Sequence, residues 1–548
     1  HRLIRRQRQM CIRDRYDIVL ILLAIGALFY FALQTDTIIY RAGVCPTTGD
    51  IIAGIIVILL VLEITRRTLG MVLVYLAVIF LLYCHYGSYL PGIIGHRGYS
   101  WSRIISYIPS LTGIFSTPIV ISASYVYLFI LFAAFMYVSG TGQFFIDFAL
   151  SVAGGKRGGP AKVAVIASAL FGTMSGSSST NVVSTGAFTI PLMKSIGYKN
   201  YFAGAVEAVA STGGQIMPPI LGSAAFIIAE LVGVSYLRVV IASIIPALLY
   251  FGAVFIMIDL EAIKLNLKGM STELLKSPIK LILNEGYLVL PVFVLVFVLV
   301  IMRASPVKAA LYSIFSVVIC ANFKKQTRMG FNKILKALNK GATNALGLIA
   351  ACATAGIVIG ALNLTGMGIK LTSIIISFSG GKLWIGLILT MVSSIILGMG
   401  MPTTAAYLVC AAVIAPALIE MGTSPLTAHM FVFFFAILSA ITPPVALAAY
   451  AASALADAKP IKIAFTACKL GITAFIIPYT FVYNPAMLME GPSLNIVILI
   501  IKSLFAVFAL AAAVQGRFYT IKLNFIEEII FLIVVFLLLL NGTLINIL

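Results

Sequence analysis

The stretch MSGSSSTN, residues 174–181, places hydroxyl groups and glycine between two apolar runs. AKVAVIASALFG (161–172) precedes it, VVSTGAFTIPLM (182–193) follows it, and both runs are compatible with lipid. Each run is too short to cross about 30 Å of hydrocarbon, which takes roughly 20 helical residues. We therefore predict a hairpin of two short helices whose polar tip lies inside a membrane.

The composition of the whole chain supports a membrane environment. Of its 548 residues, 61% are hydrophobic and only 10% are charged, and the mean hydropathy is +1.11. Soluble domains contain about 25% charged residues. Apolar segments long enough to span a bilayer recur from end to end. The chain is predicted to be an all-α polytopic protein surrounded by membrane lipid.

The net charge of +20 concentrates in short loops between apolar segments. The richest are KLNLKGMSTELLKSPIK (264–280) and KKQTRMGFNKILKALNK (324–340). Two predicted spans, 286–302 and 306–323, separate these loops and return the chain to the same face. Lys- and Arg-rich loops mark the cytoplasmic side of a membrane. We place both loops in the cytoplasm and expect no nucleic-acid partner.

The seven cysteines and four histidines are scattered singly, so the pattern predicts no transition-metal site. Residues 1–15, HRLIRRQRQMCIRDR, differ from the rest: they begin with His and contain MCIRD, which a common sequencing-transposon end encodes. We interpret this segment as a non-native sequencing or assembly scar and expect native sequence from about Tyr16. The alternative is a basic cytoplasmic leader.

Two halves of the chain, roughly 115–235 and 340–460, repeat the same pattern. At an offset of 226 residues, SGTG (139–142), AGGK (153–156) and LFGTMSG (170–176) return as LTGMG (364–368), SGGK (379–382) and ILGMGMP (396–402). At an offset of 225, TIPLMKSIGY (189–198) and QIMPPILGSAAF (215–226) return as IAPALIEMGT (414–423) and AITPPVALAAYA (440–451). An odd number of predicted spans separates the copies, which indicates an inverted repeat of the kind found in secondary transporters.

Each repeat is predicted to hold one re-entrant hairpin and one broken helix, because Gly and Pro pairs interrupt its apolar runs. Hairpin tips and unwound links leave backbone polar groups that hydrocarbon cannot satisfy, so they persist only around a polar site. Short hydroxyls and free carbonyls suit a desolvated Na⁺, and half-helix N-termini favour an anionic substrate group. The alternative is that these small residues only allow close helix packing.

The candidate Na⁺ and substrate residues follow from these four breaks. They are Ser175, Gly176, Ser177, Ser178, Thr180 and Asn181 in hairpin 1; Glu207, Ser211, Thr212, Gly213, Gly214, Gln215, Met217 and Pro218 in broken helix 1; Gly398, Gly400, Pro402, Thr403 and Thr404 in hairpin 2; and Ser439, Ala440, Thr442 and Pro443 in broken helix 2.

Acidic residues inside spans are costly and therefore mark functional sites. Asp147, Glu207, Glu230 and Glu420 are the candidates, and Glu207 is the most informative because it precedes STGGQ (211–215). Its alternative role is an interface contact or a pair with a Lys. No nucleophile elbow, HExxH or phosphate-binding loop is present, so no enzyme activity is predicted.

At these segments the chain resembles the large permease of tripartite ATP-independent periplasmic (TRAP) transporters, in the TAXI-type branch with fused small and large membrane subunits. The resemblance covers about residue 40 to the mid-480s and is carried by HRGYS (96–100), GGPAKVAVIASALFGTMSG (158–176), GAFTIPLMKSIGY (186–198), FAGAVEAVASTGGQIMPPILGSAAFIIAE (202–230), LGMGMPTTAAY (397–407) and AITPPVALAAYAAS (440–453).

The resemblance implies an elevator-type permease in the cytoplasmic (inner) membrane of a bacterium or archaeon. It implies uptake of an organic acid, driven by Na⁺ as the only ion and without another cofactor, from an extracytoplasmic TAXI-type binding protein. The alternative is a stand-alone dicarboxylate/Na⁺ symporter. Two features depart from the family: helices expected before 17–33 are lacking, and the tip SGSSSTN carries additional hydroxyls.

These observations divide the chain into six predicted segments. They are the scar 1–15; truncated small-subunit-like scaffold helices and an interfacial arm, 16–110; the first repeat, 111–260, with hairpin 160–193 and broken helix 201–232; basic cytoplasmic loops and connecting helices, 261–335; the second repeat, 336–484, with hairpin 382–418 and broken helix 426–455; and C-terminal transmembrane helices, 485–548.

Overall fold

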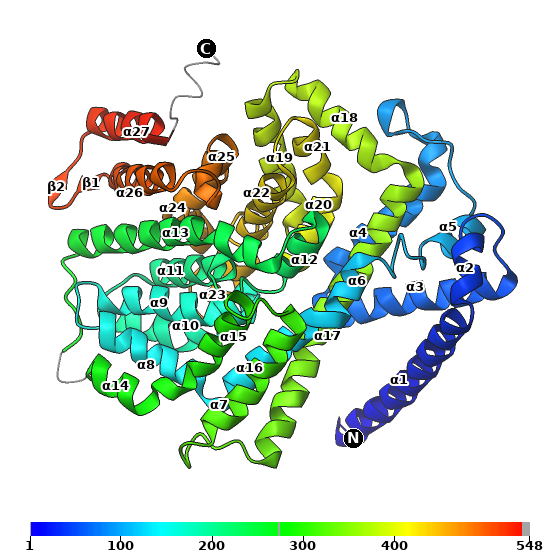
Figure 1. Cartoon of the computed structure of the whole chain (residues 1–548), viewed down its shortest axis with the longest axis horizontal. Coiled ribbons are helices and arrows are strands. Elements are labelled where there is room, and N and C mark those ends of the chain that lie inside the picture. Colours follow the sequence, from blue (N-terminus) through cyan, green and yellow to red (C-terminus); the bar gives the residue numbers. More distant parts are fainter. Residues whose placement is uncertain (1, 272–274, 540–548) are drawn as a thin grey trace. The chain divides into compact units, whose positions relative to one another are not determined.

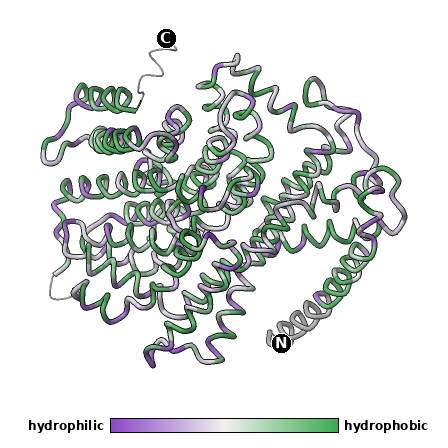
Figure 2. The backbone as a smooth tube through the Cα atoms, in the orientation of Figure 1, coloured by the Kyte–Doolittle hydropathy of each residue, from purple (hydrophilic) through white to green (hydrophobic). Residues whose placement is uncertain are grey.

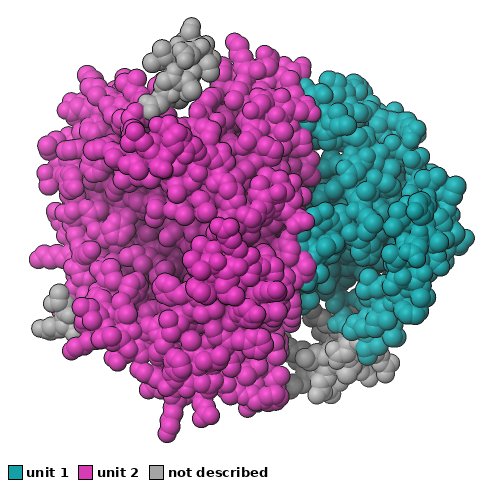
Figure 3. Space-filling view, viewed as in Figure 1, with its two compact units in different colours: residues 1–123, 346–374 teal, residues 124–345, 375–548 magenta. Residues whose placement is uncertain are grey.

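A computed structural model describes residues 2–271 and 275–539, and the chain forms two compact units (Figure 3). Unit 1 comprises residues 1–123 and 346–374, and unit 2 comprises residues 124–345 and 375–548. The six predicted segments stay predictions. Three of them include positions outside the described residues: the scar at residue 1, the cytoplasmic loops at 272–274 and the C-terminal helices at 540–548.

Unit 1 is a helical scaffold with an apolar core. Its elements are α1 (Arg2–Leu33), α2 (Thr35–Arg41), α3 (Thr48–Leu69), α4 (Met71–Tyr86), η1 (Gly87–Tyr89), η2 (Gly92–Ile94), α5 (Trp101–Tyr107), α6 (Thr117–Ile121) and parts of α17 (Phe331–Thr365) and α18 (Met367–Ser379). Val57, Ala77 and Ile357 are buried together in this core. The hydroxyls of Thr65 and Thr354 lie 2.5 Å apart, so these buried polar atoms satisfy each other.

Unit 2 holds both predicted hairpins and both predicted broken helices (Figure 1). Its elements are η3 (Ser122–Val126, shared with unit 1), α7 (Tyr127–Ser139), α8 (Thr141–Ala153), α9 (Gly159–Ser175), α10 (Ser178–Ser195), α11 (Asn200–Gly213), η4 (Gly214–Ile216), α12 (Ala224–Val232), α13 (Tyr236–Lys264), α14 (Pro278–Glu285), η6 (Gly286–Leu288), α15 (Leu290–Val300), α16 (Pro306–Ala321), α19 (Leu383–Gly398), α20 (Thr403–Val413), α21 (Ala415–Glu420), α22 (Pro425–Leu438), α23 (Leu447–Ala456), α24 (Pro460–Leu470), α25 (Ile472–Tyr483), η7 (Pro485–Leu488), α26 (Ser493–Gln515), β1 (Arg517–Phe518), β2 (Ile521–Lys522) and α27 (Phe525–Leu539).

The described residues confirm an all-α polytopic membrane protein. Six helices are long and apolar enough to cross a membrane, or up to nine if each bent helix pair counts as one span. Figure 2 shows hydrophobic residues along these helices and hydrophilic residues at connections such as the loop between α16 and α17. The two short strands form an antiparallel hairpin between α26 and α27, with Arg517 opposite Lys522.

The repeat found in the sequence has a structural counterpart, element by element. Helix α8 and helix α18 each contain 13 residues and are offset by 226 positions. Helix α11 and helix α22 each contain 14 residues and are offset by 225 positions. The cis peptide bonds Pro218–Pro219 and Pro443–Pro444 share this second offset. Equal lengths at constant offsets mean that the two copies share these elements of one helical plan.

One helix start and two helix bends differ from the sequence expectation. The sequence predicts that the second half of broken helix 1 begins near 218, directly at the Pro pair, but it begins at Ala224, because the cis Pro pair is followed by turns as far as Ser223. The predicted span 286–302 bends by 63° between η6 and α15. The apolar run 464–484 predicts one span, but the structure breaks it between α24 and α25, with a bend of 44°. Prolines 291 and 460 each lie in the first turn of a helix in these pairs, where a missing amide donor costs nothing.

The charge distribution predicts on which side of the membrane the connections lie. In a cysteine-free background, we expect Lys268→Cys and Lys325→Cys to react with an impermeant maleimide only after cells are permeabilised. Arg303→Cys, in the connection between α15 and α16, should react in intact cells, because one span separates it from each basic loop. All three side chains are exposed. Labelling of Lys268→Cys in intact cells would contradict the cytoplasmic placement.

Candidate functional site

The tip of hairpin 1 is a tight turn formed by two residues. Gly176 ends α9 in the left-handed conformation, with φ of 61°, which glycine adopts without strain. Ser177 then caps α10, and its hydroxyl accepts a hydrogen bond from the Thr180 amide at 3.4 Å. The observed turn is therefore shorter than the sequence predicted, because Ser178, Thr180 and Asn181 already belong to the first turn of α10.

The tip of hairpin 1 lies against the unwound link of broken helix 1 with almost no side chain between them. A β-carbon on Gly172 would lie 2.5 Å from the α-carbon of Gly214, and one on Gly222 would lie 2.7 Å from the α-carbon of Gly176. The Gly222 amide donates to the Thr173 carbonyl at 3.4 Å. Backbone atoms thus approach backbone atoms where both segments interrupt their helices.

Hairpin 2 and broken helix 2 repeat this contact. Gly398 and Ser439 are the counterparts of Gly172 and Gly214 at the repeat offsets, and the Ser439 hydroxyl donates to the Gly398 carbonyl at 3.0 Å. Thr442 donates to the Leu438 carbonyl at 2.8 Å, where α22 ends. Backbone amides also donate to both carbonyls, that of Met401 to Gly398 and those of Ile441 and Thr442 to Leu438, so the hydroxyl groups add side-chain donors where these helices end.

A single amide side chain joins the two hairpin tips. The hydrogen-bond network orients Gln215 with its nitrogen 2.6 Å from the Thr403 hydroxyl and 3.2 Å from the Gly176 carbonyl. Its oxygen then accepts from the Ser178 amide at 3.2 Å. Ser178 and Thr403 are equivalent positions of the two repeats, each at the start of the second hairpin helix. Gln215 therefore lies where the two repeats meet.

A second contact crosses between the repeats beside Gln215. The hydroxyls of Ser223, in the link of broken helix 1, and Thr404, in hairpin 2, lie 2.7 Å apart. Two residues without glycine's freedom adopt left-handed backbone near these links, Leu221 with φ of 55° and Ala446 with φ of 43°, and they too are equivalent positions. Such a conformation costs of order 1–3 kcal/mol, which the packed surroundings must offset.

The predicted site residues separate into two groups by exposure. The first group reaches the surface of the breaks and is only partly buried: Ser175, Gly176, Ser177, Met217, Pro218, Gly400, Pro402, Thr442 and Pro443, with Thr180 exposed. The second group is buried: Ser178, Asn181, Glu207, Ser211, Thr212, Gly213, Gly214, Gln215, Gly398, Thr403, Thr404, Ser439 and Ala440. The structure brings all four breaks together, and only the first group is partly accessible to solvent.

Glu207 lies in the interior of the first repeat, away from the tips. Its carboxylate accepts hydrogen bonds from the hydroxyls of Ser168, Thr185, Thr189 and Ser211. It pairs with no Lys or Arg within the described residues, so the ion-pair alternative is wrong. The hydroxyl of Thr212, the neighbour of Ser211, does not contact Glu207 and donates to the Ala208 carbonyl of its own helix.

The other acidic candidates lie apart from the breaks. Lys276 forms an ion pair with Asp147 at 2.7 Å, which raises the pKa of the Lys276 ammonium. Glu230 is exposed and accepts from the Tyr125 hydroxyl at 3.1 Å. Glu420 is exposed at the end of α21. Sequence reasoning selected these carboxylates by their place in apolar segments, and the structure leaves them partly or fully exposed, away from the four breaks.

Sequence reasoning missed four residues that complete these contacts. Ser168, Thr185 and Thr189 surround Glu207, and Ser223 contacts Thr404. The hydroxyls of Thr185 and Thr189 lie four residues apart on α10, a spacing that puts them on one helix face. The spacing identifies these threonines as partners of Glu207 only when that face of α10 is known to pack against α11.

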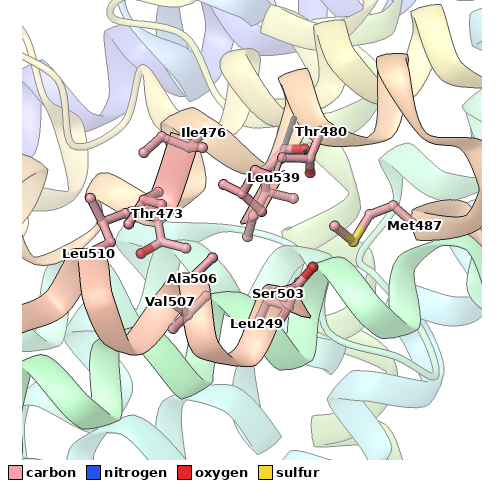
Figure 4. A pocket seen from close by; sticks show the side chains of 12 residues that line it. Leu249, Thr473, Ile476, Thr480, Met487, Ser503, Ala506, Val507, Leu510 and Leu539 are labelled. Carbon is pink, nitrogen blue, oxygen red and sulfur yellow. Dashed lines mark hydrogen bonds between the residues drawn. The ribbon is translucent and has the colours of Figure 1, made fainter. Parts of the chain in front are cut away.

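Two cavities lie away from the hairpin tips. One has a volume of about 570 Å³, and Tyr125, Glu230, Tyr236 and Arg303 contribute its polar lining. The Tyr236 hydroxyl is 2.7 Å from the Ile220 carbonyl, so this cavity adjoins the link of broken helix 1. The other holds about 20 Å³, and Figure 4 shows its largely apolar lining from α13, α25, η7, α26 and α27. Neither cavity includes a residue of the four breaks.

Comparison with known proteins agrees with a transport function. The family model of the tripartite ATP-independent periplasmic transporter, DctM component, matches residues 56–496. The chain therefore belongs to the DctM family of TRAP transporter large permeases. This is a family of transporter permeases and not a class of enzymes, and its members are multi-pass proteins of the inner membrane that work with an extracytoplasmic solute-binding protein.

Individual relatives match over different lengths. A TRAP transporter large permease of Haemophilus influenzae is 25% identical over 326 residues, which cover 58% of this chain and 74% of that protein. The C4-dicarboxylate TRAP transporter large permease proteins DctM of Vibrio cholerae and Pseudomonas aeruginosa are each 36% identical over 121 residues. That match covers 22% of this chain and 26% and 28% of those two proteins.

The backbone contact at the tip of hairpin 1 predicts a steric cost for a single methyl group. Gly172→Ala should destabilise the protein by about 1–3 kcal/mol, because its β-carbon would overlap Gly214. Thermal unfolding in detergent would measure this as a lower midpoint. Gly252→Ala is the matched control, since nothing lies within 4 Å of its β-carbon and Ala favours the helix. Equal midpoints for the two variants would contradict the contact.

The contact between Ser223 and Thr404 predicts a cross-link between the repeats. In a cysteine-free background, Ser223→Cys with Thr404→Cys should form a disulfide under mild oxidation, because the native hydroxyls lie 2.7 Å apart. A protease site inserted in loop 264–280 would leave cross-linked fragments joined until reduction. Ser195→Cys with Thr404→Cys is the control, since α10 puts Ser195 about 26 Å from Ser178. Equal cross-linking of both pairs would refute the arrangement.

Proposed function

We propose that this protein carries out Na⁺-coupled secondary uptake of an organic acid, delivered by an extracytoplasmic binding protein of the TAXI type. The observation that carries the proposal is the meeting of two hairpin tips and two unwound links around Gln215. Unwound backbone is tolerated at membrane depth only where protein buries it or where it lines a polar site. In secondary transporters such breaks hold the substrate and the coupling ion.

The chemistry of these breaks supports Na⁺ as the coupling ion. The ligands on offer are hydroxyl and carbonyl oxygens, for example those of Ser177, Thr403 and Gly398, and Na⁺ in transporters is coordinated by unwound carbonyls. Hydroxyl and carbonyl oxygens are hard donors, which disfavour soft transition metals. The partly exposed residues of the breaks are uncharged, so a cation bound among them would supply the positive charge that an acidic solute needs.

Helix N-termini at the same place support an anionic solute. We call the place where the two hairpin tips and the two unwound links meet around Gln215 the joint. Helices α10 and α20 both begin at the joint, at Ser178 and Thr403, and their first amides carry partial positive charge. Two such N-termini would attract a carboxylate without a charged side chain. The DctM proteins of Vibrio cholerae and Pseudomonas aeruginosa are named for C4-dicarboxylates, which is consistent with this class of solute.

The duplicated plan supports alternating access. We propose that the two repeats are inverted in the membrane and that the hairpins and broken helices move as one body, as an elevator, to expose the site on alternate sides. Equivalent contacts between tip and link in both repeats, Gly172 with Gly214 and Gly398 with Ser439, would keep each hairpin attached to its broken helix during that movement.

Uptake by the reconstituted chain tests the proposal. Liposomes would carry the full chain, with a TAXI-type binding protein outside, a panel of labelled mono- and dicarboxylates, and an inward Na⁺ gradient present or absent. We expect uptake that requires both the binding protein and the Na⁺ gradient. Uptake without the binding protein would support a stand-alone dicarboxylate/Na⁺ symporter, and uptake indifferent to Na⁺ would refute the coupling.

A hydroxyl at the joint should set the apparent affinity for Na⁺. Thr403→Ala removes the hydroxyl oxygen that accepts a hydrogen bond from Gln215. The Na⁺ concentration for half-maximal uptake should therefore rise about tenfold or more, equivalent to ~1.4 kcal/mol. Ser453→Ala is the control, because its hydroxyl donates only to the Tyr450 carbonyl within α23. A Thr403→Ala variant with unchanged Na⁺ dependence would remove Thr403 from the site.

A further inference from the structure

The carboxyl group of Glu207 is enclosed by hydroxyl groups. One oxygen accepts from Ser168 at 2.7 Å, Thr185 at 2.5 Å and Ser211 at 3.0 Å, and the other accepts from Thr189. The four hydroxyls come from α9, α10 and α11, and every residue of this hydroxyl cage, Glu207 included, is fully or almost fully buried. A buried carboxylate normally requires a counter-charge or must take up a proton.

Within the described residues, no charged side chain compensates Glu207. Helix α11 packs against α9, α10, α13, α23 and α24. The charged and titratable groups on these helices have other partners or are exposed. The groups with other partners are Lys162 with Asp259, Lys194 with the Ala456 carbonyl, Tyr236 with the Ile220 carbonyl, Arg238 with Glu490, Tyr250 with the Val209 carbonyl, Glu261 with Lys264, Lys462 over the ring of Tyr201, and Cys468 with the Ile441 carbonyl. Tyr450, Lys469 and Asp457, which follows α23, are exposed.

The second repeat builds the same three-helix packing without a carboxylate. At the repeat offsets, the position of Glu207 is occupied by Val432, which is fully buried on α22. The positions of the cage residues Ser168, Thr185, Thr189 and Ser211 are occupied by Ser394, Cys410, Ile414 and Ala436. An apolar core therefore holds these helices together equally well, and helix packing alone does not require Glu207 or three of its four hydroxyl partners.

The hydroxyl cage can satisfy Glu207 in both protonation states. The Thr185 hydroxyl also lies 2.8 Å from the Asn181 carbonyl, and the Thr189 hydroxyl lies 3.1 Å from the Thr185 carbonyl. When the carboxylate is ionised, both threonines can donate to it. When it is protonated, a threonine hydroxyl can donate to a carbonyl of its own helix and accept a hydrogen bond from the carboxylic O–H. No buried group then loses its partner.

We infer that Glu207 is a proton-binding site whose carboxyl group takes a proton from water and returns it to water during the transport cycle. This inference rests on the proposed function, because it adds a second coupling ion to the same machinery. Oxygens 2.5–3.0 Å apart are at hydrogen-bond distance. A Na⁺ inserted between them would hold them further apart, so the site suits a proton and not a metal ion.

A path of contacts connects this proton site to the tip of hairpin 1. The Asn181 amide donates to the Ser168 carbonyl at 2.9 Å, and the Asn181 side-chain oxygen lies 3.3 Å from the Thr185 hydroxyl. Asn181 follows Ser178 by three residues, in the turn of α10 that Gln215 contacts. Reversal of the Thr185 hydroxyl would therefore change a hydrogen bond one helical turn from the joint between the tips.

Infrared spectroscopy of the full chain in liposomes tests this inference without substrate or binding protein, so its result is independent of the uptake assay. We expect a carbonyl stretching band of a protonated carboxyl group that grows as the pH falls and shifts in deuterated water. Glu207→Gln should lose this band, and Glu420→Gln, which alters an exposed acid, should retain it. Absence of any Glu207-dependent band, or a band without a deuterium shift, would overturn the inference.

A second variant keeps the test decisive if Glu207→Gln does not fold. Thr189→Val removes one donor to the ionised carboxylate while it keeps the side-chain volume. Loss of a donor to the charged form favours the protonated form. The midpoint of the infrared band should therefore shift to higher pH in Thr189→Val and stay unchanged in Ser453→Ala. An unchanged midpoint in Thr189→Val would show that the hydroxyl cage does not control a proton.

Discussion

The structure depends on one constraint: backbone polar groups inside a membrane must find partners within the protein. Four segments of unit 2 interrupt their helices, and polar groups of one segment pair with those of another. The Gly222 amide donates to hairpin 1, the Ser439 hydroxyl donates to hairpin 2, and Gln215 connects the two tips. These contacts link the four breaks to one another.

Duplication explains how such a joint arises, and the differences between the copies locate its chemistry. The helices, the Pro pairs and the left-handed residues Leu221 and Ala446 recur at constant offsets. Two polar side chains do not recur. Gln215 corresponds to Ala440, and Glu207 corresponds to Val432. The shared features are those that backbone geometry demands, whereas the amide and the carboxylate occur only in the first repeat and are therefore free to serve function.

Much of the fold could be predicted from local sequence. Apolar length indicated a membrane protein, and Gly and Pro pairs marked the breaks, because these residues constrain the backbone wherever they stand. The onset of α12 at Ala224 was missed, since turns that follow a Pro pair carry no apolar periodicity. The bends near Leu290 and Gly471 were missed for a similar reason: an uninterrupted apolar run does not reveal where neighbouring helices make it turn.

The sequence by itself determined the class of protein, the repeat, and the four places where helices are interrupted, because hydropathy and backbone preference act locally. Only the tertiary structure decided how the polar residues divide between those breaks and the interior. Asn181 and Thr180 are adjacent in one hydroxyl-rich stretch, yet Asn181 is buried beside the hydroxyl cage and Thr180 is exposed. The helix period turns neighbouring side chains about 100° apart, and only packing against α9 and α11 decides which of them meets protein.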